Sequence, residues 1–157
     1  MKRIAIKLAI FSTLLLASAV TGAVESSEVG MTLTPDQMKW EPNPRVPGRG
    51  VARIVSQGTE AGAEVYRVQF AKGRVVQAHS HPDDRTYTAL EGTWYIGWGE
   101  KFDESKLIAL TPGSFYTEPA GAAHFVATPD GEAIVQITGM GPTKADYVDV
   151  AHAPKKK

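Results

Sequence analysis

Residues 73–92 read GRVVQAHSHPDDRTYTALEG and set two histidines, His79 and His81, two positions apart on a predicted strand. Alternate side chains of a strand leave the same face, so the two rings lie side by side and can share one ion. Residues 113–124 read GSFYTEPAGAAH and add a third histidine, His124, from a distant strand. Three neutral imidazoles suit a divalent transition metal, although an HxH pair alone also fits histidines that face water.

Short strands separated by Gly and Pro turns surround these two stretches. Residues 64–70 alternate strictly, with Tyr66, Val68 and Phe70 on one face, which is typical of a half-buried strand. The sequence predicts strands at residues 64–70, 74–80, 86–90, 93–98, 106–110, 114–118, 124–128, 132–138 and 147–150. Many short strands with almost no helix indicate an all-β sandwich or barrel.

The segments that flank the strands are predicted to be irregular. Residues 34–37 read TPDQ and predict a short helix that ends near Trp40, because a threonine can cap it and proline suits its first position. Three prolines within residues 42–47 then exclude regular structure up to Gly50. Residues 151–157 are predicted to form a flexible tail.

The first residues are typical of a secretory signal peptide. Three basic residues near the start precede an apolar run at residues 8–16, and small residues follow at 17–23. The run is too short to span a bilayer, which disfavours an uncleaved membrane anchor. We expect cleavage after Ala23, with Ala19 as the alternative, and a periplasmic or secreted bacterial protein that has no membrane attachment after cleavage.

The composition excludes several classes of protein. The 157 residues suffice for one domain of ordinary size, and the absence of cysteine excludes disulfides, thiolate metal sites and a cysteine nucleophile. The chain has 17 basic and 17 acidic residues. Residues 1–23 contain three basic and no acidic residues, so their removal leaves a net charge of −3. Nothing in this balance indicates a nucleic-acid partner.

The spacing of the glycines and histidines carries a family resemblance. Gly73 is followed by five residues and the HxH pair, and Gly92 closes that segment. The second part runs from Gly113 through five residues, Pro-Ala-Gly and two more residues to His124. This two-part pattern, over residues 73–128, resembles the signature of the cupins, which are small β-barrels of the jelly-roll type.

The resemblance implies an all-β fold, a cupin-type jelly-roll β-barrel with a short N-terminal helix. It also implies that His79, His81 and His124 hold a divalent transition metal such as Fe, Zn, Mn or Ni. The chain then divides into a signal peptide at residues 1–23, a leader with the short helix at 24–50, a barrel at 51–150 and the tail at 151–157.

One ligand of the family's pattern is missing. Cupins usually have a Glu separated from the second histidine by three or four residues, and this sequence has Arg85 and Thr86 at those positions. Three interpretations are open. The site uses three histidines and leaves positions free, as in some non-haem iron dioxygenases of the family. Alternatively, Asp83 or Asp84 supplies the fourth ligand. In the third, the barrel has lost its metal and binds a ligand by shape.

Arg85 and Tyr87 are the candidate catalytic side chains. If strand alternation persists past the turn, both face inward with the histidines, and Arg85 can bind an anionic substrate bidentately. Facing outward, Arg85 would pair with a carboxylate such as Asp83, and the rarity of buried arginine favours that orientation. Gln136 lies in an apolar strand and faces a cavity or solvent, while His152 in the tail is excluded as a ligand.

The sequence thus predicts an exported single-domain cupin with a mononuclear divalent metal that acts on a small organic molecule, as an oxygenase- or isomerase-like enzyme. The alternative is a non-catalytic barrel that binds or senses a small ligand, with or without a metal. A homodimer is possible because cupins often form one, but no stretch of the sequence marks an interface.

Overall fold

The computed structural model describes residues 30–55 and 59–155. Within them, segments rich in β-branched and aromatic residues form antiparallel strands. The strands are β1 (Glu41–Pro42), β2 (Arg49–Val55), β3 (Gly62–Phe70), β4 (Arg74–Ser80), β5 (Arg85–Glu91), β6 (Trp94–Trp98), β7 (Ile108–Leu110), β8 (Phe115–Glu118), β9 (His124–Thr128), β10 (Ala133–Gly141) and β11 (Asp146–Tyr147). Short 3-10 turns at Pro35–Gln37, Glu104–Lys106 and Val150–His152 are the helical elements of the described residues.

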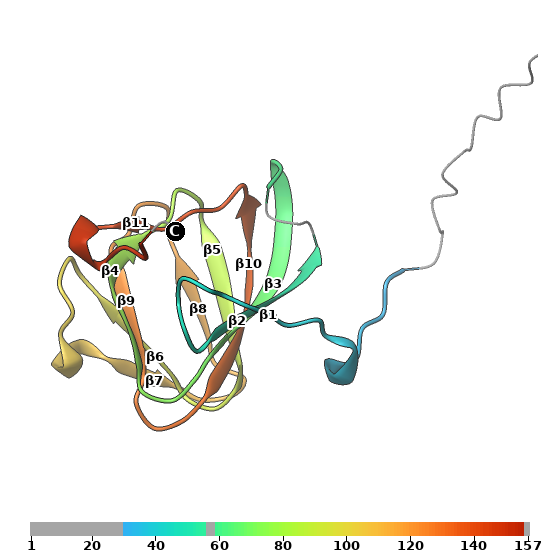
Figure 1. The fold of residues 1–157 in the computed structure, drawn as a ribbon, viewed down its shortest axis with the longest axis horizontal. Coiled ribbons are helices and arrows are strands. Elements are labelled where there is room, and N and C mark those ends of the chain that lie inside the picture. Colours follow the sequence, from blue (N-terminus) through green and yellow to red (C-terminus); the bar gives the residue numbers. More distant parts are fainter. Residues whose placement is uncertain (1–29, 56–58, 156–157) are drawn as a thin grey trace, which may run out of the picture. The chain divides into compact units, whose positions relative to one another are not determined.

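The strands form two sheets that enclose one apolar core (Figure 1). One sheet has the order β1-β2-β3-β10-β5-β8 and the other has the order β11-β4-β9-β6-β7. Strands far apart in sequence are therefore neighbours, as β3 with β10 and β4 with β9. The core between the sheets contains Tyr66, Val68, Phe70, Tyr87, Trp94, Ile96, Val126, Ala133, Val135 and Ile137. The all-β prediction is confirmed, and nearly every predicted strand is present.

One stretch expected to be irregular contains strands. β1 and the start of β2 lie within the proline-rich leader, where regular structure was excluded up to Gly50. Pro42 is tolerated because β1 is a short edge strand, and Pro44 and Pro47 lie in the connecting turn. That turn is closed by the bonds from Val46 N–H to the Asn43 carbonyl, 3.1 Å, and from Arg49 N–H to the Val46 carbonyl, 3.0 Å. β2 then pairs with β3 in a register that sets Arg49 opposite Phe70.

The ends of the described chain also differ in detail from the prediction. The helix predicted from residue 34 is a single 3-10 turn, at Pro35–Gln37, in which the Gln37 side chain accepts a hydrogen bond from the Thr34 N–H, 2.9 Å. The strand expected at residues 147–150 is the two-residue β11, which pairs with β4. A 3-10 turn follows it at Val150–His152, within what was predicted as tail.

The predicted signal peptide, residues 1–23, lies outside the described residues. Among the described residues, no helix has the length and apolar character needed to cross a membrane.

Gly92 shows how the barrel depends on a glycine of the predicted pattern. Its φ of +65° is a conformation that L side chains rarely adopt, and an added Cβ would lie 1.9 Å from the carbonyl oxygen of Glu132. The turn between β5 and β6 therefore packs directly on the backbone that enters β10.

Candidate metal centre and its cavity

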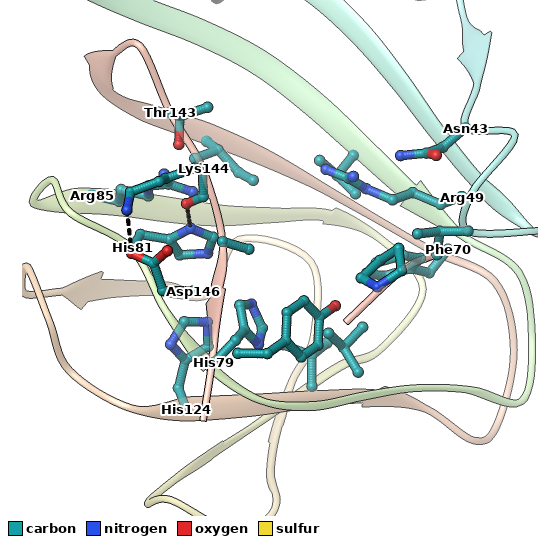
Figure 2. A pocket seen from close by; sticks show the side chains of 18 of the residues that line it. Asn43, Arg49, Phe70, His79, His81, Arg85, His124, Thr143, Lys144 and Asp146 are labelled. Carbon is teal, nitrogen blue, oxygen red and sulfur yellow. Dashed lines mark hydrogen bonds and ion pairs between the residues drawn. The ribbon is translucent and has the colours of Figure 1, made fainter. Parts of the chain in front are cut away.

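The three predicted histidines come together in the structure. His79 lies in β4, His81 follows the end of β4, and His124 begins β9. β4 and β9 are paired with His79 opposite His124, so the backbone register itself brings two of the rings together. The ring centroids of His79 and His124 are 4.2 Å apart, and one nitrogen of each histidine lies within 4.8 Å of the other two (Figure 2).

Backbone carbonyls fix the tautomer of all three rings. The Nδ1 atoms of His79, His81 and His124 contact the carbonyl oxygens of Gln77, Lys144 and Ala122 at 2.8, 2.5 and 3.1 Å. A carbonyl oxygen can only accept, so each Nδ1 carries the proton and each Nε2 keeps its lone pair. This is the arrangement that orients a histidine for metal binding through Nε2.

Burial keeps the imidazoles neutral. It lowers the pKa of His81 to about 2, with the positive charge of Arg85 adding to the effect. It also lowers the pKa of His124 to about 3, helped by His79, and it lowers the pKa of His79. Because only neutral imidazole binds a metal, the three side chains are ready to ligate at physiological pH.

Glu118, which the sequence analysis missed, joins this cluster. It is the last residue of β8 and is only 1% exposed. Its Oε2 lies 3.2 Å from Nε2 of His124, and its Oε1 lies 3.7 Å from Nε2 of His81. Burial raises the pKa of Glu118 to about 7, against the opposing effects of the Tyr87 hydroxyl and Arg85. Neither carboxylate oxygen makes a hydrogen bond of good geometry with any described residue.

Two hydrogen bonds hold Glu118 beside the histidines. The Gly121 N–H donates to the His81 carbonyl, 2.8 Å, and the Ala120 N–H donates to Oδ1 of Asp84, 2.7 Å. They fasten the turn after β8 to the loop between β4 and β5. In the sheet, Glu118 pairs with Arg85 across β8 and β5. The carboxylate thus stands directly across the ladder from the position where the cupin pattern has its glutamate.

The donor set fits a divalent transition metal. Two ligands that each lie about 2.1 Å from one ion are about 3.0–3.4 Å apart at bond angles of 90–109°. The 3.2 Å between Glu118 and His124 falls in this range, whereas the 3.7 Å between Glu118 and His81 is longer. Three neutral imidazoles and one carboxylate are ligands that Zn, Fe, Mn and Ni accept. A buried carboxylate without a hydrogen-bond partner is costly unless a cation faces it, and the three Nε2 lone pairs cannot serve as that cation.

Arg85 faces inward, as strand alternation predicts. The alternative expectation, that it points toward solvent, is wrong. It is 4% exposed and lines the cavity beside the histidines. Asp83 nevertheless binds it bidentately, with Nη2 donating to Oδ1 at 2.7 Å and Nε donating to Oδ2 at 3.0 Å. Nη1 also donates to the Tyr66 hydroxyl, 3.2 Å. Burial alone would lower the pKa of Arg85, but the neighbouring tyrosines and Asp83 raise it overall.

Asp83 and Asp84 do not supply the fourth ligand. Asp83 is paired with Arg85, and Asp84 accepts the hydrogen bond from Ala120. Of the two polar side chains considered for the cavity wall, Tyr87 lines it and stacks on Tyr116. The structure places Gln136 elsewhere, on the other face of β10, where it accepts a hydrogen bond from Nε of Arg67, 3.3 Å.

Strand parity could have revealed Glu118. Tyr116 packs against the core, and Glu118 is two residues further along the same strand, so both side chains leave the same face. A glutamate that follows an inward-facing aromatic residue on a short strand, directly before the Pro-Ala-Gly turn, is the signal that was overlooked.

The histidines open onto a cavity of about 660 Å³ (Figure 2). Its walls come from both sheets, from the proline-rich turn and from the C-terminal segment, including Ala153 and Pro154. Apolar and aromatic side chains form much of the lining: Val68, Phe70, Val76, Trp94, Val126 and Ile137. Tyr147 stacks on His79 with the ring centroids 5.3 Å apart. A cavity of this size and lining accommodates a small organic molecule next to the histidines.

Solved structures with the same fold confirm the jelly-roll barrel. The polyketide cyclase RemF from Streptomyces resistomycificus superposes with a TM-score of 0.64 at 15% identity, over 80% of this chain and 90% of RemF. A sugar phosphate isomerase of the cupin superfamily from Silicibacter pomeroyi gives a TM-score of 0.54 at 21% identity, over 70% and 75% of the two chains. A predicted oxalate decarboxylase from Thermotoga maritima gives 0.55 at 17% identity, over 71% and 99%.

At the sequence level, no curated protein matches this chain. The model of the ChrR cupin-like domain matches residues 28–144, which is more than half of the chain. The match includes β1 to β10, all three histidines and Glu118. The chain therefore belongs to the ChrR cupin-like family of the cupin superfamily.

Proposed function

We propose that the protein binds one divalent transition metal through His79, His81, His124 and Glu118 and acts on a small organic molecule that enters the adjoining cavity. The observation that carries the proposal is the convergence of three Nε2 lone pairs with the buried carboxylate of Glu118, which makes no hydrogen bond of good geometry within residues 30–55 and 59–155. The three histidines line that cavity. The similar structures named as an isomerase, a cyclase and a predicted decarboxylase support a small-molecule substrate.

A metal bound here supplies Lewis acidity, and if it is redox-active it also supplies oxygen chemistry, in an isomerase- or oxygenase-like reaction. The chain's own groups hold and shape the site. The three backbone carbonyls orient the imidazoles. Arg85 and Tyr87, which the sequence singled out as catalytic, both adjoin Glu118 and act as positioning residues for its carboxylate.

The first test is elemental analysis of residues 24–157, purified without a nickel column, beside a His79→Ala/His124→Ala double variant. The His152→Ala variant is the matched control, because His152 is exposed and pairs with Asp149 away from the cluster. We expect about one equivalent of a transition metal in the wild type and in the control, and none in the double variant. Equal metal content in all three proteins, or none in the wild type after reconstitution, contradicts the proposal.

A non-catalytic binding barrel is the second candidate, and one observation favours it. Among the described lining residues the carboxylate is that of Asp146, which pairs with Lys144 at 2.9 Å, and the neighbouring Glu118 faces the histidines. No free general base is then evident among the described lining residues. Metal-loaded protein that binds a small molecule without consuming oxygen or forming product supports this function over the enzymatic one.

We further propose that the protein is exported and acts in the periplasm or outside the cell, on the signal-like composition of residues 1–23. N-terminal sequencing of the protein expressed from the full chain in a bacterial host tests this. A mature protein that starts at Val24 or Val20 supports export, whereas an intact N-terminus on protein found in the cytoplasm overturns it.

A further inference from the structure

One cation of the cavity has no counter-charge in the described part of the chain. Arg49 begins β2 and is partly buried, and no described carboxylate lies within salt-bridge distance of its guanidinium. No described side chain or backbone group forms a hydrogen bond with it either. Figure 2 shows Arg49 across the cavity from the histidines, with its guanidinium directed into the open space.

The other cations that line the cavity contrast with Arg49. Arg85 is neutralised by Asp83 at 2.7 Å, and Lys144 is neutralised by Asp146 at 2.9 Å. Arg45 also lines the cavity but is exposed to water. Arg49 is surrounded by tyrosines and by the cation of Arg53, and burial lowers its pKa. A guanidinium stays protonated even so, which leaves one uncompensated positive charge inside the cavity.

The backbone holds this charge in place. The Asn43 N–H donates to the Arg49 carbonyl, 2.8 Å, and the Arg49 N–H donates to the Val46 carbonyl, 3.0 Å. β2 pairs with β3 from this residue onward. The backbone that carries Arg49 is therefore fixed at a strand end, so only the side chain itself has to be ordered when a ligand binds.

We propose that Arg49 binds the oxyanion, carboxylate or phosphate, of a small molecule with an apolar body, and that this molecule extends across the cavity toward the histidines. The planar guanidinium fork matches such an oxyanion bidentately. Phe70 and Trp94, which stack on each other with centroids 5.5 Å apart, and Val68 provide the apolar surface between the two ends. The inference deepens the proposed function. It rests on that function only for the end of the ligand that reaches the metal; oxyanion binding at Arg49 does not depend on it.

The test is calorimetric binding of benzoate, phenylacetate and phenyl phosphate, with benzamide and phenylacetamide as uncharged counterparts, to metal-free and metal-loaded protein. Arg49→Met removes the charge at similar length, and Arg49→Lys keeps the charge without the fork. Arg67→Gln is the matched control, because Arg67 lies on the other face of the sheet beside Gln136. Circular dichroism and metal content, measured on every variant, establish that the fold and the metal centre are intact.

We expect at least one acid or phosphate to bind the wild type and the Arg67→Gln control, with its amide binding at least tenfold more weakly. Arg49→Met should weaken that binding by roughly 10- to 100-fold, the strength of one or two charge-assisted hydrogen bonds, and Arg49→Lys should lie between. If carboxylates bind and phosphates do not, or the reverse, the result identifies the class of oxyanion.

Two results overturn the inference. One is that no acid or phosphate of the set binds the wild type. The other is that Arg49→Met binds it as tightly as the wild type does. The outcome is separable from the proposed function. Oxyanion binding that depends on Arg49, in a protein that takes up no metal on reconstitution, supports the inference and refutes the metal centre. A protein that binds the metal but shows no oxyanion binding at Arg49 supports the proposed metal centre and overturns the inference.

Discussion

At the scale of single residues, the surroundings of Glu118 disfavour ionisation of its carboxyl group but favour the binding of a metal ion. Its carboxyl group is buried, and the pKa of about 7 expresses the free-energy cost of ionising it in the metal-free protein. The same carboxylate lies within 3.2 Å of a histidine Nε2 that offers a lone pair to an ion. A divalent cation between the two would remove the cost of burial and use both groups as ligands.

Glu118→Gln should therefore change stability in opposite directions without and with metal. A carboxyl group whose pKa is higher in the folded state than its usual 4.5 loses stabilisation as the pH rises through 4.5 to 7. At pH 8 the metal-free variant should be more stable than the wild type, by up to about 3 kcal/mol, and at pH 4.5 the two should be alike. With saturating zinc the order should reverse.

Urea unfolding at both pH values, with EDTA or with zinc, measures this, and Glu91→Gln at an exposed glutamate is the control. A metal-free Glu118→Gln variant that is less stable than the wild type at pH 8 would show that the carboxylate is satisfied without a metal.

The histidines predict the acid stability of the metal-free protein. A buried His with a lowered pKa gives stability that is complete above about pH 6.5, the value in the unfolded chain, and is lost as the pH falls toward the folded-state value. That value is about 2 for His81 and about 3 for His124. Each should add about 1.4 kcal/mol of destabilisation per pH unit below 6.5.

Urea unfolding in EDTA between pH 7.5 and 5 measures the slope, which His81→Gln should reduce and the exposed His152→Ala should leave unchanged. A free energy of unfolding that is flat over this range, in the wild type and in His81→Gln alike, would mean that folding does not lower the pKa of these histidines.

At the scale of elements, turns decide where the site residues lie. The proline-rich turn between β1 and β2 presents Arg49 to the cavity, and the Pro-Ala-Gly turn between β8 and β9 fastens Glu118 beside His81. The turn at Gly92 has a different role. It connects β5 and β6 and packs against the backbone of Glu132, directly before β10.

Gly92→Ala should destabilise the protein much more than Gly113→Ala. Both glycines have positive φ, +65° and +90°, so alanine is strained at either position. Only at Gly92 would the new Cβ also meet a backbone oxygen, that of Glu132 at 1.9 Å. We expect a difference of about 3 kcal/mol or more in the free energy of unfolding, measured by urea denaturation. Equal effects would mean that the Gly92 turn can move away from β10.

At the scale of the whole molecule, the proposed metal site joins the two sheets. His79 and His124 belong to the sheet of β4 and β9, whereas Glu118 ends β8 in the other sheet. A ligand that binds only the folded protein stabilises it by mass action, by about 2.7 kcal/mol at a free concentration one hundred times its Kd.

Zinc at such a concentration should therefore raise the thermal midpoint of the wild type and of His152→Ala, and EDTA should reverse the change. The His124→Ala variant should show no such shift. A zinc-induced rise that persists in His124→Ala would place the stabilising ion at another site.

The sequence by itself determined the barrel and the three imidazoles, because period-two alternation, Gly and Pro turns and the HxH spacing are local properties. The positions of β4 and β9 and of the histidines on them could be read directly. Strands β1 and β2 were missed, because three prolines within residues 42–47 indicate irregular structure, and the hydrogen bonds that close the turn between the two strands cannot be read from the sequence.

Only the tertiary structure decided which charges meet. Glu118 lies opposite Arg85 because β8 pairs with β5, and Asp83 turns to Arg85 rather than to the histidines. Arg49 has no carboxylate within salt-bridge distance among residues 30–55 and 59–155. Pairings of this kind depend on register between strands that are distant in sequence, and the strength of each charge depends on its burial. Neither quantity is encoded in the spacing of residues along one strand.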